Sequence, residues 1–242
     1  MAGLREILIV AVFAGACAHK QAPPPVEPVR QTVAPQPPPP EPEDEIKVSG
    51  TLGSLSDDEI SGPFKRRWDD ITRCYADAQA KLPYLGGRLE IKLRVGAKGE
   101  LKKSFVSSST MGNYQAEKCI LAVARELAFS KPHGGPEAEF TYPLEFRGPR
   151  NVSEWDGGRV QPAVARHKRD VSQCKARGGG GLPAGLSLTV YVAPGGKVTS
   201  AGVSADAPLD DAFAACLVDK TRLWRLDDPL GRIAKATVEV RE

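Results

Sequence analysis

The chain has 242 residues, of which 41% are hydrophobic and 26% are charged, the balance of a globular protein rather than of a fibrous or wholly disordered one. Its 33 basic and 30 acidic side chains leave a formal net charge of only +3. A nucleic-acid-binding protein needs a concentrated basic surface, and the short basic run Lys65-Arg66-Arg67 is followed at once by Trp68-Asp69-Asp70. We therefore expect no nucleic-acid partner and interpret that run as a solvated helix face.

The N-terminus is typical of an exported protein. An apolar run of twelve residues extends from Ile7 to Ala18; it is shorter than the roughly 20 residues that span a bilayer, but it suits the apolar region of a signal peptide. The run contains Ala14-Gly15-Ala16-Cys17, which resembles the bacterial lipobox except that Ala14 replaces the usual leucine. We expect residues 1–16 to be a signal peptide and Cys17 to be lipidated, with Ala18 favouring the outer membrane. An ordinary cleaved signal and an uncleaved anchor are the alternatives.

Residues 17–55 are predicted to be a lipid-anchored, proline-rich linker. Ten of the 21 residues from Ala22 to Pro42 are proline, and an acidic run extends from Glu41 to Glu45. Proline fixes its own backbone and removes a hydrogen-bond donor, so the segment favours an extended polyproline spacer. At about 3.1 Å per residue, roughly 35 residues would reach on the order of 100 Å, comparable with the width of a periplasm. A disordered linker whose length has no role is the alternative.

Residues 56–147 carry the first of two similar patterns. A stripe of apolar residues with helical spacing is followed by two alternating strands around the turn Gly96–Gly99, a second helical stripe and a last alternating strand. The apolar positions are Phe64, Trp68, Ile71, Tyr75 and Ala78 in the first helix; Leu89, Ile91, Leu93 and Val95, then Leu101 and Val106, in the hairpin; Ala116, Cys119, Ile120, Val123 and Leu127 in the second helix; and Phe140, Tyr142, Leu144 and Phe146 in the last strand.

Residues 158–242 repeat this order after a linker at 148–157. Their pattern consists of Val160, Val164, Val171 and Cys174, then Leu186, Leu188, Val190 and Val192, the turn Pro194–Lys197, a return strand from Val198, a helix begun by Pro208 that carries Leu209, Phe213, Cys216, Leu217 and Lys220, and a strand with Ala236, Val238 and Val240. We therefore expect an α+β fold with two tandem α-β-β-α-β domains, at 56–147 and 158–242.

The four cysteines beyond Cys17 support the repeat. An exported chain folds in an oxidising compartment, where an even number of cysteines indicates disulfides first. Cys74 matches Cys174 at an offset of 100, and Cys119 matches Cys216 at an offset of 97. The repeat favours the pairs Cys74–Cys119 and Cys174–Cys216, each between two helices. A zinc site of four cysteines is the alternative, but the sequence offers no Cys-x-x-Cys pair for it.

The stretches "ITRCYADA", "LPYLGGRLEIKLRVGAKGEL", "VSSSTMGN", "EKCILAVARELAFSKPHGG" and "TYPLEF" occur in this order. Together they resemble the C-terminal domain of the AgmX/PglI gliding-motility proteins, a relative of the TonB C-terminal domain. The resemblance covers residues 56–147. The second pattern is more diverged, because Lys175 stands where the first has Tyr75 and no Tyr-Pro precedes its last strand.

The resemblance implies a periplasmic, disulfide-bonded and non-enzymatic adaptor, TonB-like, in gliding motility or envelope transport machinery. Such proteins bind an extended segment of an envelope protein along a sheet edge. The expected edge strand is the one with Phe140, Tyr142, Leu144 and Phe146, or another exposed edge; the alternative is that these strands are simply paired core. TonB itself spans the inner membrane with a true helix, whereas this chain has only a candidate lipid anchor, so direct use of the proton-motive force is not expected.

The sequence also bears on two other classes of protein. An enzyme is not expected: the three histidines, His19, His133 and His167, belong to no recognisable catalytic or metal-binding motif, and we expect neither cofactor nor metal. A lipoprotein that binds peptidoglycan or another glycan is the alternative function. Trp155, in the predicted linker, is its candidate sugar-stacking residue, because Trp68 lies on the apolar stripe and Trp224 near the end of the last helix, so both are expected in the core.

Overall fold

A computed structural model of the chain describes residues 47–48, 53–149, 151–177 and 181–241. The described elements belong to one compact unit, residues 43–242. The predicted signal peptide, Cys17 and most of the linker at 17–55 lie outside the described residues.

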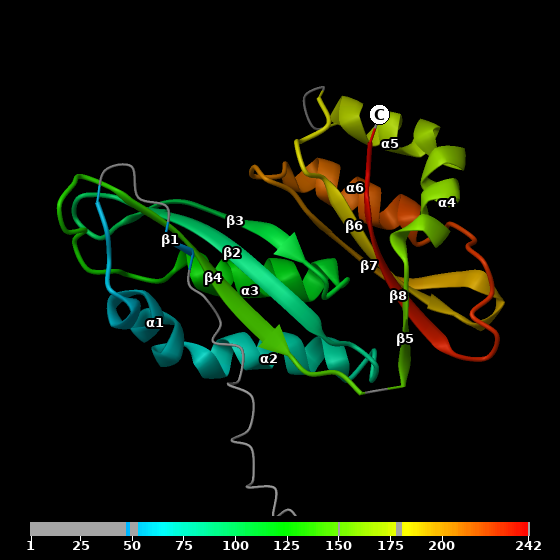
Figure 1. The fold of residues 1–242 in the computed structure, drawn as a ribbon, viewed down its shortest axis with the longest axis horizontal. Helices are drawn as coiled ribbons and strands as arrows, with labels where there is room; N and C mark the ends of the chain where they lie inside the picture. The colour runs from blue at the N-terminus through cyan, green and yellow to red at the C-terminus, as the bar shows by residue number, and fades with distance from the viewer. Residues whose placement is uncertain (1–46, 49–52, 150, 178–180, 242) are drawn as a thin grey trace, which may run out of the picture. The chain divides into compact units, whose positions relative to one another are not determined.

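The first sheet and its helices are formed by residues up to Phe146 (Figure 1). The elements are β1 (Lys47–Val48), α1 (Asp57–Arg66), α2 (Trp68–Gln79), β2 (Gly87–Val95), β3 (Leu101–Ser109), α3 (Tyr114–Arg125) and β4 (Ala138–Phe146). The strands are antiparallel in the order β1-β4-β2-β3. Leu89, Ile91, Leu93 and Val95 of β2 are all buried, so one face of this sheet lies in the core with the helices.

The second sheet also has four strands, and its elements follow the same order with two additional 3-10 turns. The elements are β5 (Val152–Trp155), the 3-10 turn η1 (Gly157–Arg159), α4 (Gln161–Arg166), α5 (Lys168–Arg177), β6 (Ser187–Ala193), the 3-10 turn η2 (Pro194–Gly196), β7 (Lys197–Ser204), α6 (Asp211–Thr221) and β8 (Ile233–Glu239). The strand order is β5-β8-β6-β7, in which β5 is parallel to β8 and the other pairs are antiparallel.

The expected α+β class, with two sheets and helix-to-helix disulfides, is confirmed. Three local expectations differ. The first helix of each half is divided, because Arg67 (φ −109°, ψ 16°) and His167 (φ −100°, ψ 21°) leave the helical region. The helix expected to begin at Pro208 begins at Asp211, where the Asp210 side chain caps it by accepting from the Phe213 amide at 2.9 Å. The expected linker at 148–157 supplies β5.

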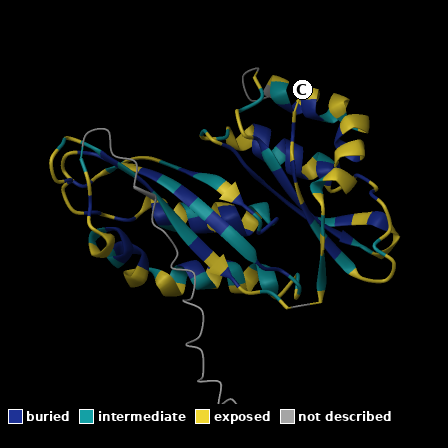
Figure 2. Cartoon of the chain, viewed as in Figure 1, coloured by how far each residue is buried: buried dark blue, intermediate teal, exposed yellow. Residues whose placement is uncertain are grey.

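A seam of polar contacts joins the two halves. Tyr191 is 1% exposed, and its hydroxyl donates to the Gly86 carbonyl at 2.7 Å and accepts from the Gly86 amide at 3.1 Å. The Thr189 hydroxyl donates to the Ser109 carbonyl at 2.8 Å. Thr189 and Tyr191 alternate along β6 with Leu188, Val190 and Val192, so one face of β6 packs on its own helices and the other on the first half. This explains why the middle of β6 is buried on both faces (Figure 2).

The seam also brings the terminal strands of the two sheets together. β3 and β7 contact each other, and the Ala205 amide beside β7 donates to the Val106 carbonyl of β3 at 3.4 Å. β4 and β8 lie on the other side of their sheets, separated from β3 and β7 by β2 and β6.

Candidate functional site

The outer side of β4 pairs with another described strand over only part of its length. On its inner side β4 pairs with β2 over its whole length, from Gly87↔Phe146 to Val95↔Ala138. On its outer side the described part of β1 pairs with Phe140 and Thr141, and no strand of the described residues pairs with residues 143–146. We call the outer backbone of residues 143–146 the open edge. The first part of the expected edge strand therefore lies between β1 and β2, and its last part pairs only with β2 among the described strands.

The side chains predicted for this strand point into the core. Phe140, Leu144 and Phe146 are 1%, 3% and 6% exposed, and Tyr142 is half-buried. A partner along this edge would therefore meet the backbone of β4 first, with the buried side chains holding that backbone in place.

Pro143 indicates which way the backbone groups of β4 point. Proline has no N–H, so in a strand paired with β2 its nitrogen faces away from β2. Since the direction alternates along a strand, the amides of Thr141 and Glu145 also face outward. The open edge thus offers the outward N–H of Glu145, with Pro143 leaving one donor position empty.

Aromatic rings from the first two helices support the open edge from below. Phe64 of α1 stacks on Tyr142, with ring centroids 3.7 Å apart and planes within 5°. Tyr75 of α2 stacks on Phe146 at 4.7 Å. The Tyr75 hydroxyl also donates to the Leu85 carbonyl at 2.7 Å, and its burial raises the pKa of the phenol despite a hydrogen bond from Gln79.

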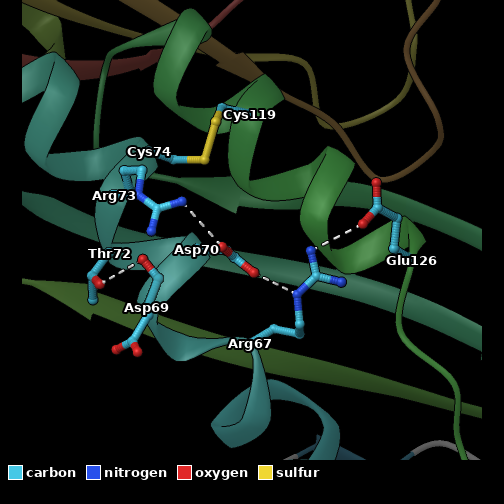
Figure 3. Close-up of polar contacts among 8 residues, drawn as sticks. All are labelled: Arg67, Asp69, Asp70, Thr72, Arg73, Cys74, Cys119 and Glu126. Carbon is cyan, nitrogen blue, oxygen red and sulfur yellow. Dashed lines mark hydrogen bonds and ion pairs between the residues drawn. A yellow bond between two sulfur atoms is a disulfide. The ribbon is translucent and has the colours of Figure 1, made fainter.

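The helices below the edge are joined by the first disulfide (Figure 3). Cys74 of α2 is bonded to Cys119 of α3, with their Cα atoms 5.7 Å apart. Arg67 adds a surface link, because its Nη2 lies 3.0 Å from Glu126 Oε2 and its Nε lies 2.6 Å from Asp70 Oδ2. The hydrogen bond from Arg67 lowers the pKa of the Asp70 carboxyl. The pairs are largely solvent-exposed, so we assign the linkage of the helices mainly to the disulfide.

The second half has a corresponding helix pair. Cys174 of α5 is bonded to Cys216 of α6, with Cα atoms 5.6 Å apart. Asp170 accepts from the indole N–H of Trp224 at 3.1 Å and lies 3.0 Å from His167 Nδ1. Burial raises the pKa of the Asp170 carboxyl, but these hydrogen bonds outweigh it and leave the pKa below its ordinary value. Both predicted disulfides are therefore present, and the four sulfurs are not arranged as a zinc site.

The outer side of β8 is occupied by the chain itself. β5 pairs with it in parallel, from Val152↔Ile233 to Trp155↔Ala236. Trp155, the candidate sugar-stacking residue, is half-buried against the second core, and the Arg159 guanidinium lies 5.3 Å from its ring centroid. Part of the Trp155 ring is thus already in contact with protein.

The tryptophans expected in the core have different environments. Trp224 is buried at 2% exposure, as expected, but Trp68 is 43% exposed, so the core assignment of Trp68 is wrong. Trp68 lies at the first residue of α2, just after the break at Arg67, where the helix face turns away from the core. One side of its ring faces Phe146, with planes within 4° and centroids 6.4 Å apart.

His133 and His167 lie in separate local contacts, and His19 lies outside the described residues. His133 Nε2 is 3.0 Å from Glu59 Oε1 at the surface, and the pKa of Glu59 is lowered to about 2, first by the backbone hydrogen bond from Ser56 and then by His133. His167 stacks on Trp224 at 4.7 Å. Among the described residues, no group of three or more histidine, cysteine or acidic side chains could hold a metal ion.

One buried carboxyl group lies in the seam between the halves. Glu117 of α3 is 2% exposed and accepts from the Ser109 hydroxyl at 2.7 Å, while its Oε2 has no hydrogen-bond partner among the described residues. Any side chain at Gly202 of β7 would collide with this carboxyl. Burial raises the pKa of Glu117 to about 7, and the hydrogen bonds only partly oppose that rise.

Comparisons with known protein families, with curated proteins and with solved structures find no match to this chain. Within the described part of the chain, no helix has the length and apolar character needed to cross a membrane.

Proposed function

We propose that this protein is a non-enzymatic envelope adaptor, TonB-like, that captures an extended segment of a partner protein by strand addition at the open edge of β4. The proline-rich arm would carry the binding domain away from a lipid at Cys17, in the periplasm and anchored to the outer membrane. Gliding-motility or envelope-transport machinery supplies the partner, in keeping with the AgmX/PglI-like stretches.

The observation that carries this proposal is the contrast between the outer sides of β4 and β8. β8 accepts β5 as a parallel strand over four residue pairs, whereas among the described residues β4 pairs on this side only with the two-residue β1. Within the described part of the chain, this position of the second sheet thus holds an added strand over more residue pairs than the same position of the first sheet. Backbone hydrogen bonds would supply most of the affinity for a partner strand.

The halves are proposed to be tandem copies of one domain. Arg67, Asp70 and Cys74 correspond to His167, Asp170 and Cys174 at a constant offset of 100, and the helices break at the same position. In this interpretation the first copy binds and the second, whose edge is filled by β5, completes the structure. The disulfides favour an oxidising compartment, which agrees with a periplasmic location.

A proline at Glu145 tests the use of the open edge. The side chain of Glu145 is exposed, and its amide faces outward like the nitrogen of Pro143, so Glu145→Pro removes an outward N–H without removing a hydrogen bond to β2. Glu145→Ala is the matched control, because it keeps that N–H. We would place a photo-crosslinking amino acid at Thr141 in the full chain and irradiate intact cells.

We expect a crosslinked adduct in the otherwise unchanged chain and in Glu145→Ala, and its loss in Glu145→Pro. An adduct that persists unchanged in Glu145→Pro would show that the partner does not pair with this backbone. Both variants should give the same thermal unfolding midpoint within a few degrees, which separates loss of binding from loss of folding.

A further inference from the structure

The two disulfides differ in how far their cysteines are buried. Cys174 and Cys216 are 0% and 6% exposed, and both lie in the core of the second half. Cys74 is 7% exposed and lies in the core of the first half. Cys119, by contrast, is exposed to solvent. A dissolved reagent therefore has a way to the first disulfide that the burial of Cys174 and Cys216 denies it at the second.

Cys119 lies at a cleft between the two halves of the chain. The cleft has a volume of about 340 Å³ and is lined by Cys74 and Cys119, whose bond bridges α2 and α3 (Figure 3). Its other walls include Ala116 of α3, Thr199 of β7 and Val218 of α6. Sites for small molecules have volumes of about 300 to 1,000 Å³, so this cleft has room for an incoming thiol.

Four charged side chains line the same cleft and form no ion pair with any residue that the structure describes. They are Asp77 and Lys81, at and just after the end of α2, and Asp219 and Arg222, at and just after the end of α6. Acids and bases are equal in number, so they leave no excess negative charge beside the disulfide to repel an incoming thiolate.

These features suit thiol–disulfide exchange that begins at Cys119. A thiolate attacks one sulfur of a disulfide, and access to that sulfur is one factor that sets the rate. Attack at Cys119 forms a mixed disulfide, breaks the bond to Cys74 and releases the Cys74 thiolate, which takes up a proton because its burial disfavours the charge. A second thiolate of the same reagent then attacks the reagent's own sulfur and releases Cys119. Two electrons and two protons thus pass to the chain, and the reagent becomes a disulfide.

We propose that the Cys74–Cys119 bond is a site of thiol–disulfide exchange that is entered at Cys119 through this cleft, with a dithiol as its co-reactant. The buried Cys174–Cys216 bond keeps α5 and α6 linked, so the exchange would release α2 from α3 alone. This inference does not require strand addition at β4.

A reduction race within one molecule tests the proposal. The probe is dithiothreitol, added under native conditions to the purified, oxidised full chain. Samples are quenched with iodoacetamide, and peptide mass spectrometry identifies the alkylated cysteines. We expect Cys74–Cys119 to open at least about tenfold faster than Cys174–Cys216, the internal control, because access differs between them. Equal rates, or faster opening of Cys174–Cys216, would overturn the proposal.

Urea separates attack through the cleft from attack after unfolding. The race is repeated at urea concentrations below the unfolding transition. Direct attack at the exposed Cys119 should change in rate by less than about twofold, whereas reduction that waits for the fold to open accelerates with urea. A Cys74–Cys119 rate that rises steeply, in step with that of Cys174–Cys216, would show that reduction needs unfolding and would contradict entry through the cleft.

The variants Cys74→Ser and Cys119→Ser form a matched pair, because each loses the same disulfide and keeps one of its thiols. Ellman's reagent should react at least about tenfold faster with Cys119 in Cys74→Ser than with Cys74 in Cys119→Ser, relative to each variant in urea. The reverse order would refute Cys119 as the entry point. Repeating the race with reduced thioredoxin identifies the source of the dithiol: opening of Cys74–Cys119 at a similar or higher rate favours a protein, and opening by dithiothreitol alone favours a small molecule.

Discussion

At the scale of single residues, Glu117 has the environment that the sequence alone could not reveal. It follows Ala116 in an ordinary amphipathic helix, where a glutamate is normally solvated. Its burial depends on Gly202 and its neighbours in β7, which come from the other half of the chain. Sequence periodicity describes one helix at a time, so a carboxyl buried by a distant strand is missed.

This carboxyl makes stability depend on pH. The pKa of Glu117 is about 7 in the folded chain against an ordinary value of 4.5, so between these values the folded state binds more protons than the unfolded state. Stability from Glu117 is therefore fully present below pH 4.5 and is lost as the pH rises through 7. The expected loss is on the order of 3 kcal/mol.

Glu117→Gln measures this effect, because it keeps the shape and removes the titration. Both proteins are unfolded with urea from pH 4.5 to 8, and the difference between their free energies of unfolding is taken at each pH. The other titrating groups are the same in both proteins, so their contributions cancel in this difference. We expect the unchanged chain to lose stability relative to Glu117→Gln as the pH rises. A difference that stays constant over this range would mean that the Glu117 carboxyl is already ionised when buried.

At the scale of elements, the helix pairs show which linkage dominates. The disulfide Cys74–Cys119 closes a separation of 45 residues and Cys174–Cys216 one of 42. The chain-entropy account gives about 4 kcal/mol for loops of this size. An exposed ion pair such as Arg67–Glu126 contributes about 1 kcal/mol or less. Removal of the covalent link should therefore cost several times more than removal of the charge.

The double variant Cys74→Ala with Cys119→Ala should lower the free energy of unfolding by about 4 kcal/mol. Arg67→Ala should lower it by less than about 1 kcal/mol. Urea unfolding without reductant measures both. If Arg67→Ala costs as much as the double variant, the charged contacts of Arg67 matter more to this helix pair than their exposure suggests.

The elements also show how far the sequence predicts the fold. Apolar residues that recur with a period of 3.6 predicted the helices, and those with a period of 2 predicted the long strands. The offset of 100 between Cys74 and Cys174 indicated a repeat, and the repeat predicted the cysteine pairs. β5 was missed because its four residues carry little pattern of their own and pair with β8, about 80 residues away in sequence. The outward direction of Trp68 was missed because the helical stripe continues across the break at Arg67, whereas the helix does not.

At the scale of the whole molecule, the seam decides which edges remain for binding. β3 and β7 contact each other, β5 pairs with β8, and among the described residues no strand pairs with the outer side of residues 143–146 of β4. The hydroxyl groups of Tyr191 and Thr189 donate hydrogen bonds to backbone carbonyls of the first half. These directional bonds fix the relative position of the two buried surfaces in the seam. In the proposed function, the two copies would therefore act as one binding unit.

The proposed function also requires that this unit is tethered at Cys17 and oxidised. The intact mass of the protein, purified from its native membranes without reductant, tests both requirements at once. We expect a mass equal to residues 17–242 plus a lipid adduct, less four hydrogens for the two disulfides. A mass that begins at Met1 without lipid would instead indicate an uncleaved anchor and favour a transducer held in the inner membrane. Four free thiols would contradict both disulfides and remove the strongest argument for a periplasmic location.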